Sequence, residues 1–90
     1  MKISVAVITS NQQDTIAQTL DSILCQKGDF EVEVVVGEDC STDNTLAICQ
    51  EYAERYPEQV VLLKNTHNLG ITANFARVMK ACTGELVSVI

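Results

Sequence analysis

The sequence predicts an α/β fold with a doubly wound, mostly parallel sheet. Short runs of β-branched apolar residues alternate with segments whose apolar residues recur at helical spacing, in the order β-α-β-α-β-α-β. Connections of this length fit right-handed crossovers, which join parallel strands. A chain of 90 residues is long enough for one small domain, so we expect a single unit over residues 1–90.

The first predicted strand is Ile3–Ile8, whose continuous apolar run is typical of a strand buried on both faces. Turn-forming residues at Thr9–Asn11 end it. Apolar residues then recur at helical spacing at Ile16, Leu20, Ile23 and Leu24. We expect this helix to run to about Cys25, with Asn11 as its N-cap and Asp14 as an acid in its first turn.

The second strand follows a break at Lys27-Gly28-Asp29. Residues 30–36 alternate at first and then become wholly apolar, which predicts a strand that enters from the surface and ends in the core. A polar turn over 38–43 follows. Apolar residues at Leu46, Cys49, Tyr52, Ala53 and Tyr56 then predict a second helix, which Pro57 ends.

The last two strands flank a third helix. The third strand is predicted at Val60–Leu63 and the loop after it at Asn65–Gly70. An amphipathic helix follows, with Phe75, Val78, Met79 and Cys82 on its apolar face. Gly84 stops this helix, and Glu85–Ile90 begins a fourth strand. Because native chains rarely end on an apolar strand, we expect the sequence to be truncated there.

Composition excludes several classes of function. The net charge is −6 and no basic stripe is present, so nucleic acid is not an expected partner. No apolar stretch approaches the length of about 20 residues that crosses a bilayer, and no signal peptide is visible, so we expect a cytoplasmic chain. The four cysteines lack metal-ligand spacing and are expected to be reduced thiols, with Cys25, Cys49 and Cys82 on buried helical faces.

Ligand sites in doubly wound sheets form at the carboxyl ends of the strands. Glu38 and Asp39 stand where the second strand surfaces. One interpretation is that this acid-rich turn only caps the second helix. Capping needs one side chain, however, and Ser41-Thr42-Asp43 can supply it. The second interpretation is that a spare carboxylate accepts a hydrogen bond from a ligand N–H, such as that of a uracil or guanine ring.

Small and amide residues surround this acidic pair. Gly37 and Cys40 either allow a flat ring to approach the backbone or simply make a tight turn. Asn68, Gly70 and Asn74 surround the start of the third helix, where an N-terminus could face a phosphate, although such residues also serve as ordinary turn formers. Neither a dinucleotide fingerprint nor a P-loop is present, so phosphates must be held another way.

Five ordered segments together resemble the family 2 glycosyltransferases of the GT-A fold, particularly bacterial cell-surface polysaccharide enzymes. The segments are Thr9-Ser10-Asn11, Leu20-Asp21-Ser22-Ile23-Leu24-Cys25-Gln26, Gly37-Glu38-Asp39-Cys40-Ser41-Thr42-Asp43, Asn68-Leu69-Gly70 with Asn74-Phe75, and Thr83-Gly84-Glu85. The resemblance covers the whole chain. It implies the strand order 3-2-1-4 and a nucleotide-sugar donor, most simply a UDP-sugar, with a saccharide or lipid-linked acceptor.

The resemblance also implies roles for individual residues. Thr9, Asn11 and Asp39 become contacts to the nucleoside, with Glu38 beside them, while Asn68, Gly70 and Asn74 become donor-site candidates. Two departures stand out, since Ser10 replaces the family's usual aromatic residue and Ala73 stands where relatives often carry Lys. They imply weaker donor binding or a different nucleotide.

In the family, the acids that hold Mg²⁺ or Mn²⁺ follow the fourth strand directly, which would place them just past Ile90. The catalytic base would also lie there, so we expect no catalytic residue, no metal ligand and no turnover from residues 1–90 alone. The fourth strand is expected to form an exposed apolar edge that self-associates. The alternative is a non-catalytic α/β binding or regulatory module whose Glu38 and Asp39 form a receiver-like acidic site.

Overall fold

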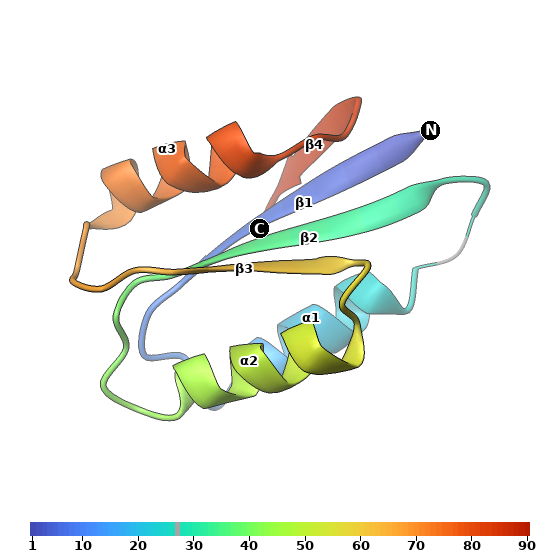
Figure 1. The fold of residues 1–90 in the computed structure, drawn as a ribbon. Helices are drawn as coiled ribbons and strands as arrows, with labels where there is room; N and C mark the ends of the chain where they lie inside the picture. The colour runs from blue at the N-terminus through green and yellow to red at the C-terminus, as the bar shows by residue number, and fades with distance from the viewer. Residues whose placement is uncertain (27) are drawn as a thin grey trace.

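A computed structural model describes residues 1–26 and 28–90 (Figure 1). Lys27, which belongs to the predicted break after the first helix, lies outside the described residues. The described part of the chain contains the seven elements that the sequence predicts, in the predicted order. They are β1 (Lys2–Thr9), α1 (Ile16–Leu24), β2 (Glu31–Glu38), α2 (Thr45–Arg55), β3 (Val60–Lys64), α3 (Ile71–Ala81) and β4 (Leu86–Val89).

All strand pairs are parallel and the sheet order is β3-β2-β1-β4, which confirms the expected fold class and strand order. β1 and β2 pair along their whole length, up to Thr9 opposite Glu38. β3 ends level with them, with Lys64 opposite Glu38. The residues that follow these three strands therefore lie at the same end of the sheet.

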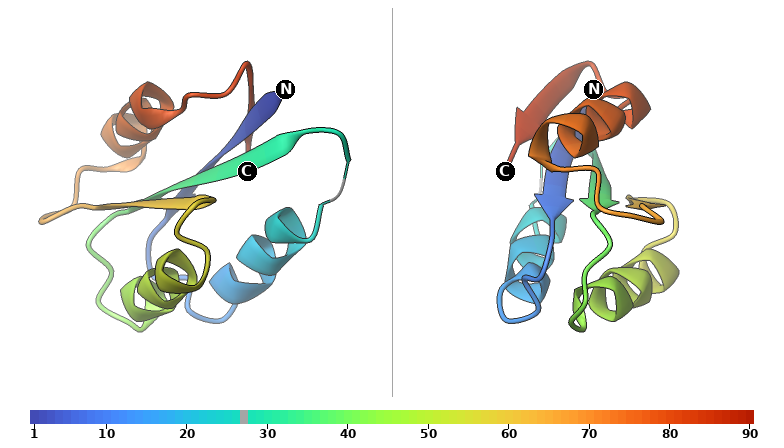
Figure 2. Two further views of the ribbon diagram at one scale, coloured as in Figure 1. Left: turned by 45° about the vertical axis from the view of Figure 1, so that its right-hand side comes forward. Right: turned by 90° about the vertical axis from the view of Figure 1, so that its left-hand side faces the viewer.

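The sheet separates two layers of helices. α1 and α2 cover one face and α3 covers the other (Figure 2). Side chains alternate between the faces of a strand, so the continuous apolar runs of β1 and β2 serve two cores. On the face of α1 and α2 the buried residues are Val5, Val7, Ile16, Leu20, Ile23, Val34, Val36, Cys49, Tyr52 and Val60. Ala6 and Val35 meet Val78 of α3 on the other face.

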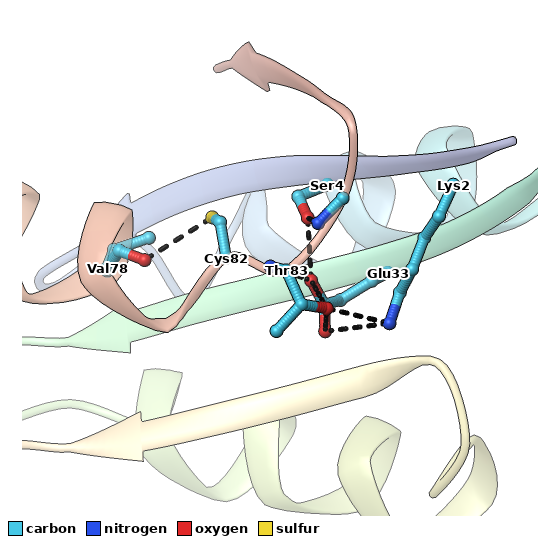
Figure 3. A network of polar contacts seen from close by, with 7 residues as sticks. Lys2, Ser4, Glu33, Val78, Cys82 and Thr83 are labelled. Carbon is cyan, nitrogen blue, oxygen red and sulfur yellow. Dashed lines mark hydrogen bonds and ion pairs between the residues drawn. The ribbon is translucent and has the colours of Figure 1, made fainter.

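A buried carboxylate joins the strands at the opposite, amino end of the sheet (Figure 3). Glu33 of β2 is 7% exposed and accepts hydrogen bonds from the Ser4 hydroxyl at 2.6 Å and the Thr83 N–H at 3.0 Å. The Lys2 ammonium lies 3.5 Å from it. Gly84 fits against this cluster because a Cβ there would lie 2.6 Å from the Ser4 nitrogen. The segment Thr83-Gly84 therefore fixes the connection from α3 to β4.

The start of the first helix differs from the prediction. α1 begins at Ile16 with Thr15 as its N-cap, and no side chain caps it, so Asn11 is not the N-cap and Asp14 lies before the helix. Asn11 instead adopts a left-handed conformation with φ of 51°. Its backbone N–H donates to the Ser41 hydroxyl at 2.9 Å. This contact to the next loop keeps the chain out of a helical conformation at Asn11.

The cysteines are free, but they do not all lie in the core as predicted. Cys49 is buried, and burial raises its pKa to about 12. Cys25 is exposed and Cys82 is only half-buried. Both are the C-cap residues of their helices, so they lie just beyond the last turn that packs on the sheet. In each case the predicted apolar face of the helix extended one residue beyond the observed end of that helix.

Candidate functional site

The carboxyl ends of β1 and β2 border a pocket of about 270 Å³. Its lining residues are Ile8, Thr9, Ser10, Gln12, Asp39, Ile71 and Asn74. Three of the seven predicted site residues, Thr9, Asp39 and Asn74, therefore meet at one pocket. The other four, Asn11, Glu38, Asn68 and Gly70, lie in the surrounding loops and do not line it.

Thr9 joins the two central strands at the pocket. It is the last residue of β1, and its carbonyl oxygen accepts the backbone N–H of Asp39 at 3.0 Å. Its hydroxyl donates to the Gln12 side-chain oxygen at 2.7 Å. Because a hydroxyl has one proton and two acceptor positions, the Thr9 oxygen remains able to accept a hydrogen bond from a ligand.

Asp39 is the charged group of the pocket and holds the loop before α3. Its Oδ1 accepts the backbone N–H of Leu69 at 2.7 Å and the Asn65 amide at 3.0 Å. Its Oδ2 accepts the Gly70 N–H at 3.1 Å. The Leu69 N–H, followed by the Asn65 amide, lowers the pKa of Asp39, so the carboxyl group is ionised at neutral pH.

The structure gives Glu38 and Asp39 protein partners, so neither carboxylate is wholly free. Glu38 is 1% exposed and accepts the Ser41 N–H at 2.6 Å, so it stabilises the β2–α2 loop. Asp43 supplies the hydrogen bonds at the start of α2, accepting the N–H of Thr45 at 2.9 Å and its hydroxyl at 2.6 Å. Asp43 thus bonds to the first residue of α2, but the N-cap of this helix is Asn44, whose side chain makes no capping hydrogen bond.

Asn11 connects the two loops beside the pocket. Its side-chain oxygen accepts the Thr42 N–H at 2.8 Å, which together with the bond to Ser41 links the β1–α1 loop to the β2–α2 loop. The residue is exposed but lies outside the pocket lining. Its observed contacts position the loop that carries Gln12 and Thr9.

Gly37 has a different role from the one predicted. It was expected either to admit a flat ring or to make a tight turn, yet it lies within β2. A Cβ at this position would collide with the side chains of Asn74 and Val78 on α3. Its small size therefore allows α3 to pack closely on the sheet, and this packing brings Asn74 to the pocket.

The start of α3 is built around a glycine and an anion. Gly70 is the N-cap with φ of 86°, a conformation that L residues rarely adopt. The backbone N–H groups of Leu69 and Gly70 donate to the Asp39 carboxylate. Asp39 therefore occupies two of the donors at the start of α3 that were expected to face a phosphate. Asn68 is exposed, whereas Asn74 is buried in the first turn of the helix.

Sequence reasoning missed three residues of this site. Asn65 is 3% exposed and bonds to both Asp39 and Asn74, while Gln12 and Ile71 line the pocket. Asn65 directly follows β3, so the rule that sites form at the carboxyl ends of strands could have identified it. Ile71 is 77% exposed although apolar, which gives the pocket an open hydrophobic rim.

The described residues do not fit a metal centre. Over residues 1–26 and 28–90, no three His, Cys, Asp or Glu side chains come close enough together to hold an ion. The pocket offers hydrogen-bond acceptors and an apolar rim, which suit a small organic ligand.

Comparison with known proteins identifies a family. The family model described as glycosyl transferase family 2 matches residues 4–90. The crystal structure of Staphylococcus aureus TarS (residues 1–349) with UDP-GlcNAc has a TM-score of 0.80 at 32% identity, covering 100% of this chain and 26% of that one. The mannosyltransferase PcManGT of Pyrobaculum calidifontis, solved with GDP-Man and Mn²⁺, has a TM-score of 0.81 at 30% identity, covering 94% and 25%.

A curated relative gives a third comparison. The dTDP-rhamnosyl transferase RfbG of Shigella flexneri is 37% identical over 73 residues, which are 80% of this chain and 25% of that protein. The chain spans between 11% and 31% of the length of the curated relatives it matches.

Proposed function

Because the chain belongs to glycosyltransferase family 2, we propose that residues 1–90 form the nucleotide-sugar-binding half of a GT-A domain whose donor is a UDP-sugar. One observation carries this proposal. Asp39 Oδ2 accepts a single hydrogen bond among the described residues, from Gly70, and Asp39 lines the pocket together with Thr9. A carboxylate oxygen has two acceptor positions, so one remains for the ring N–H of a nucleobase.

The donors named for three relatives support this reading of Asp39. UDP-GlcNAc, GDP-Man and the dTDP-sugar carry uracil, guanine and thymine. Each of these bases presents a ring N–H beside a carbonyl group, which is the pattern that an ionised carboxylate can accept from. We favour uracil because the TarS structures solved with UDP and with UDP-GlcNAc cover 100% of this chain, at 34% and 32% identity.

The remaining site residues receive roles in the same proposal. Thr9 and Asp39 contact the nucleoside, Asn74 contributes to the donor pocket, and Asn68 and Gly70 belong to the loop that closes over the donor. Asn11 and Glu38 act indirectly, since their observed hydrogen bonds hold the loops around the pocket. Ile71 supplies apolar surface at the pocket. This surface partly replaces the aromatic ring that the family usually carries at the position of Ser10.

We assign the reaction to cell-surface polysaccharide synthesis with a saccharide or lipid-linked acceptor. Glycosyltransferases that act on poly(ribitol-phosphate) or transfer rhamnosyl groups are among the relatives. The metal ligands and the catalytic base would lie past Ile90, so residues 1–90 alone are expected to bind a nucleotide without turning over. The described residues fit no Mg²⁺ or Mn²⁺ ion and supply no metal-dependent step.

A cytoplasmic location agrees with the chemistry of the cysteines. Cys25, Cys40, Cys49 and Cys82 are all free thiols, which is usual in reducing compartments. None of the helices within 1–26 and 28–90 has the length and apolar character needed to cross a bilayer. We therefore propose that this part of the enzyme works in the cytoplasm, at the inner face of the membrane if its acceptor is lipid-linked.

An NMR titration tests the proposed function. UDP added to the ¹⁵N-labelled chain is expected to shift the amide signals of Thr9, Asp39 and Gly70, which surround the pocket. The amides of Glu33 and Thr83 at the opposite end of the sheet serve as the internal control and are expected to stay in place. Shifts confined to the control residues, or none at millimolar UDP, would overturn the proposal.

A further inference from the structure

Two buried amides behind the pocket form a hydrogen-bond relay of fixed direction. Asn74 donates from its Nδ2 to the carbonyl oxygen of Gly37 at 3.0 Å. A carbonyl oxygen can only accept, so the Asn74 amide must turn its own oxygen toward Asn65. Asn65 consequently presents its Nδ2, which donates to that oxygen at 3.0 Å. Both side chains are at most 3% exposed, so water does not replace these partners.

The relay ends at Asp39. The same Asn65 Nδ2 donates to Asp39 Oδ1 at 3.0 Å, and Oδ1 also accepts the Leu69 N–H. Both acceptor positions of Oδ1 are therefore filled, whereas Oδ2 keeps one open. Arg77 completes the arrangement from the other side, because its guanidinium donates to the side-chain oxygen of Asn65. Guanidinium has no acceptor, so it favours the same orientation of the Asn65 amide.

We propose that Asn65, oriented by Asn74 and Arg77, is a positioning residue that sets base specificity by holding Oδ1 of Asp39, so that the open acceptor position of Oδ2 stays directed to the base. A group at position 65 that repels Asp39 would turn this acceptor away. This inference rests on the proposed function, in which a nucleobase meets Asp39. Uracil offers an N3–H to the open position of Oδ2. Cytosine has an unprotonated ring nitrogen at the same place and is repelled by the carboxylate. The chain should therefore discriminate between the two bases as long as Asn65 donates to Asp39.

Calorimetric titrations of UMP and CMP into the whole chain at pH 8 test this role. We expect the wild type to prefer UMP by about tenfold or more. With CMP, the unprotonated ring nitrogen of cytosine faces the Asp39 carboxylate, and both acceptors are left without a donor. Asn65→Asp replaces the donating amide with a second carboxylate and should reduce the UMP preference at least fivefold. Arg77→Met, which removes only the outer donor, should reduce it about two- to threefold. Arg55→Met changes an exposed arginine of α2 and serves as the matched control with unchanged preference.

A pH profile separates positioning from a merely structural role. As the pH falls from 8 to 5.5, the two adjacent carboxyl groups of Asn65→Asp should take up a shared proton. The introduced group then donates to Asp39 again, and the preference for UMP should recover relative to the wild type. The other charged groups around Asp39 are Glu38, His67 and Arg77. His67 is present in every variant, so the comparison with the wild type removes its effect.

The outcomes are distinguishable. Failure of the wild type to bind UMP overturns the proposed function and this inference together. Binding of UMP by the wild type, with an unchanged preference in both Asn65→Asp and Arg77→Met, overturns only the positioning role. A reduced preference in Asn65→Asp that does not recover at pH 5.5 also overturns it. If circular dichroism shows that Asn65→Asp is unfolded, Arg77→Met measured against Arg55→Met decides the question.

Discussion

The Ser4 hydroxyl of β1 donates to the Glu33 carboxylate of β2 at 2.6 Å, at the end of the sheet opposite the pocket. Burial by itself raises the pKa of Glu33, but the hydrogen bonds from Ser4 and Thr83 and the charge of Lys2 together lower it below its usual range. Glu33 is therefore a buried anion that the fold stabilises by three partners. Its function is structural, because it pins the connection that leads into β4.

The first prediction follows from this lowered pKa. A group with a depressed folded-state pKa stabilises the fold above the ordinary glutamate pKa of about 4.3 and loses that contribution as the pH falls through its folded-state pKa. Glu33→Gln should lower the free energy of unfolding at pH 7 by about 1–3 kcal/mol, since buried donors lose a charged acceptor.

Urea denaturation at pH 7 and pH 3.5 checks this prediction. The difference between wild type and Glu33→Gln should shrink at pH 3.5, below the ordinary glutamate pKa of about 4.3, because the carboxyl group of the unfolded chain then takes up a proton that the folded carboxylate resists. Glu54→Gln changes an exposed acid of α2 and is the control. An equal difference in the free energy of unfolding at both pH values would show that the charge of Glu33 does not stabilise the fold.

The second prediction concerns thiol reactivity. Cys25 is exposed, whereas Cys49 is buried with its pKa raised to about 12. Since the thiolate is the reactive form, iodoacetamide at pH 8 should label Cys25 rapidly and leave Cys49 unlabelled until the chain unfolds. Peptide mass spectrometry over time gives the order of labelling. Early modification of Cys49 would contradict its position in the core.

The third prediction concerns the exposed edge of the sheet. Leu86, Val87, Val89 and Ile90 are each at least 39% exposed, and β4 pairs with β1 on one side only within the described residues. Apolar edges of this kind recruit other chains, so we expect the 90-residue chain to self-associate on concentration. Val89→Lys should reduce this association, because a charge on an edge strand disfavours pairing with another chain.

Sedimentation velocity at increasing concentration provides the measurement. Val61→Lys places the same charge on β3, the other edge strand, and therefore tests whether the association uses β4 in particular. Val87 and Val89 are two residues apart in β4, so they share a face, and their pairing with Ser4 and Ala6 places both on the side of α3. A wild-type chain that stays monomeric would contradict the prediction.

The fold was predictable because its signals are local and repeated. Continuous apolar runs such as Ile3–Ile8, separated by helical periodicity, predict a parallel sheet. The strand order was implied by the family resemblance, and the observed order β3-β2-β1-β4 agrees with it. Element ends were less predictable, as α1 shows. Asn11 looks like an N-cap by its chemistry, but its hydrogen bonds to Ser41 and Thr42 cross 30 or more residues and outweigh the local preference.

The site was predictable in part for the same reason. The end of a strand can be located from the sequence, and Thr9 and Asp39, both predicted at strand ends, line the same pocket. The partners of each acid could not be located in this way, because Glu38 and Asp39 are adjacent but point to different neighbours. Asn65 was missed because its contacts depend on how closely α3 approaches the sheet at Gly37.

The central claim is that Asp39 binds the base of a nucleotide. Its most direct test is the calorimetric affinity of UMP for the wild type and for Asp39→Ala, with Asp14→Ala as a control that changes an exposed aspartate away from the pocket. Loss of a charged acceptor should weaken UMP binding by at least about fivefold, while Asp14→Ala binds like the wild type. An Asp39→Ala variant that remains folded and binds UMP with wild-type affinity would contradict the account.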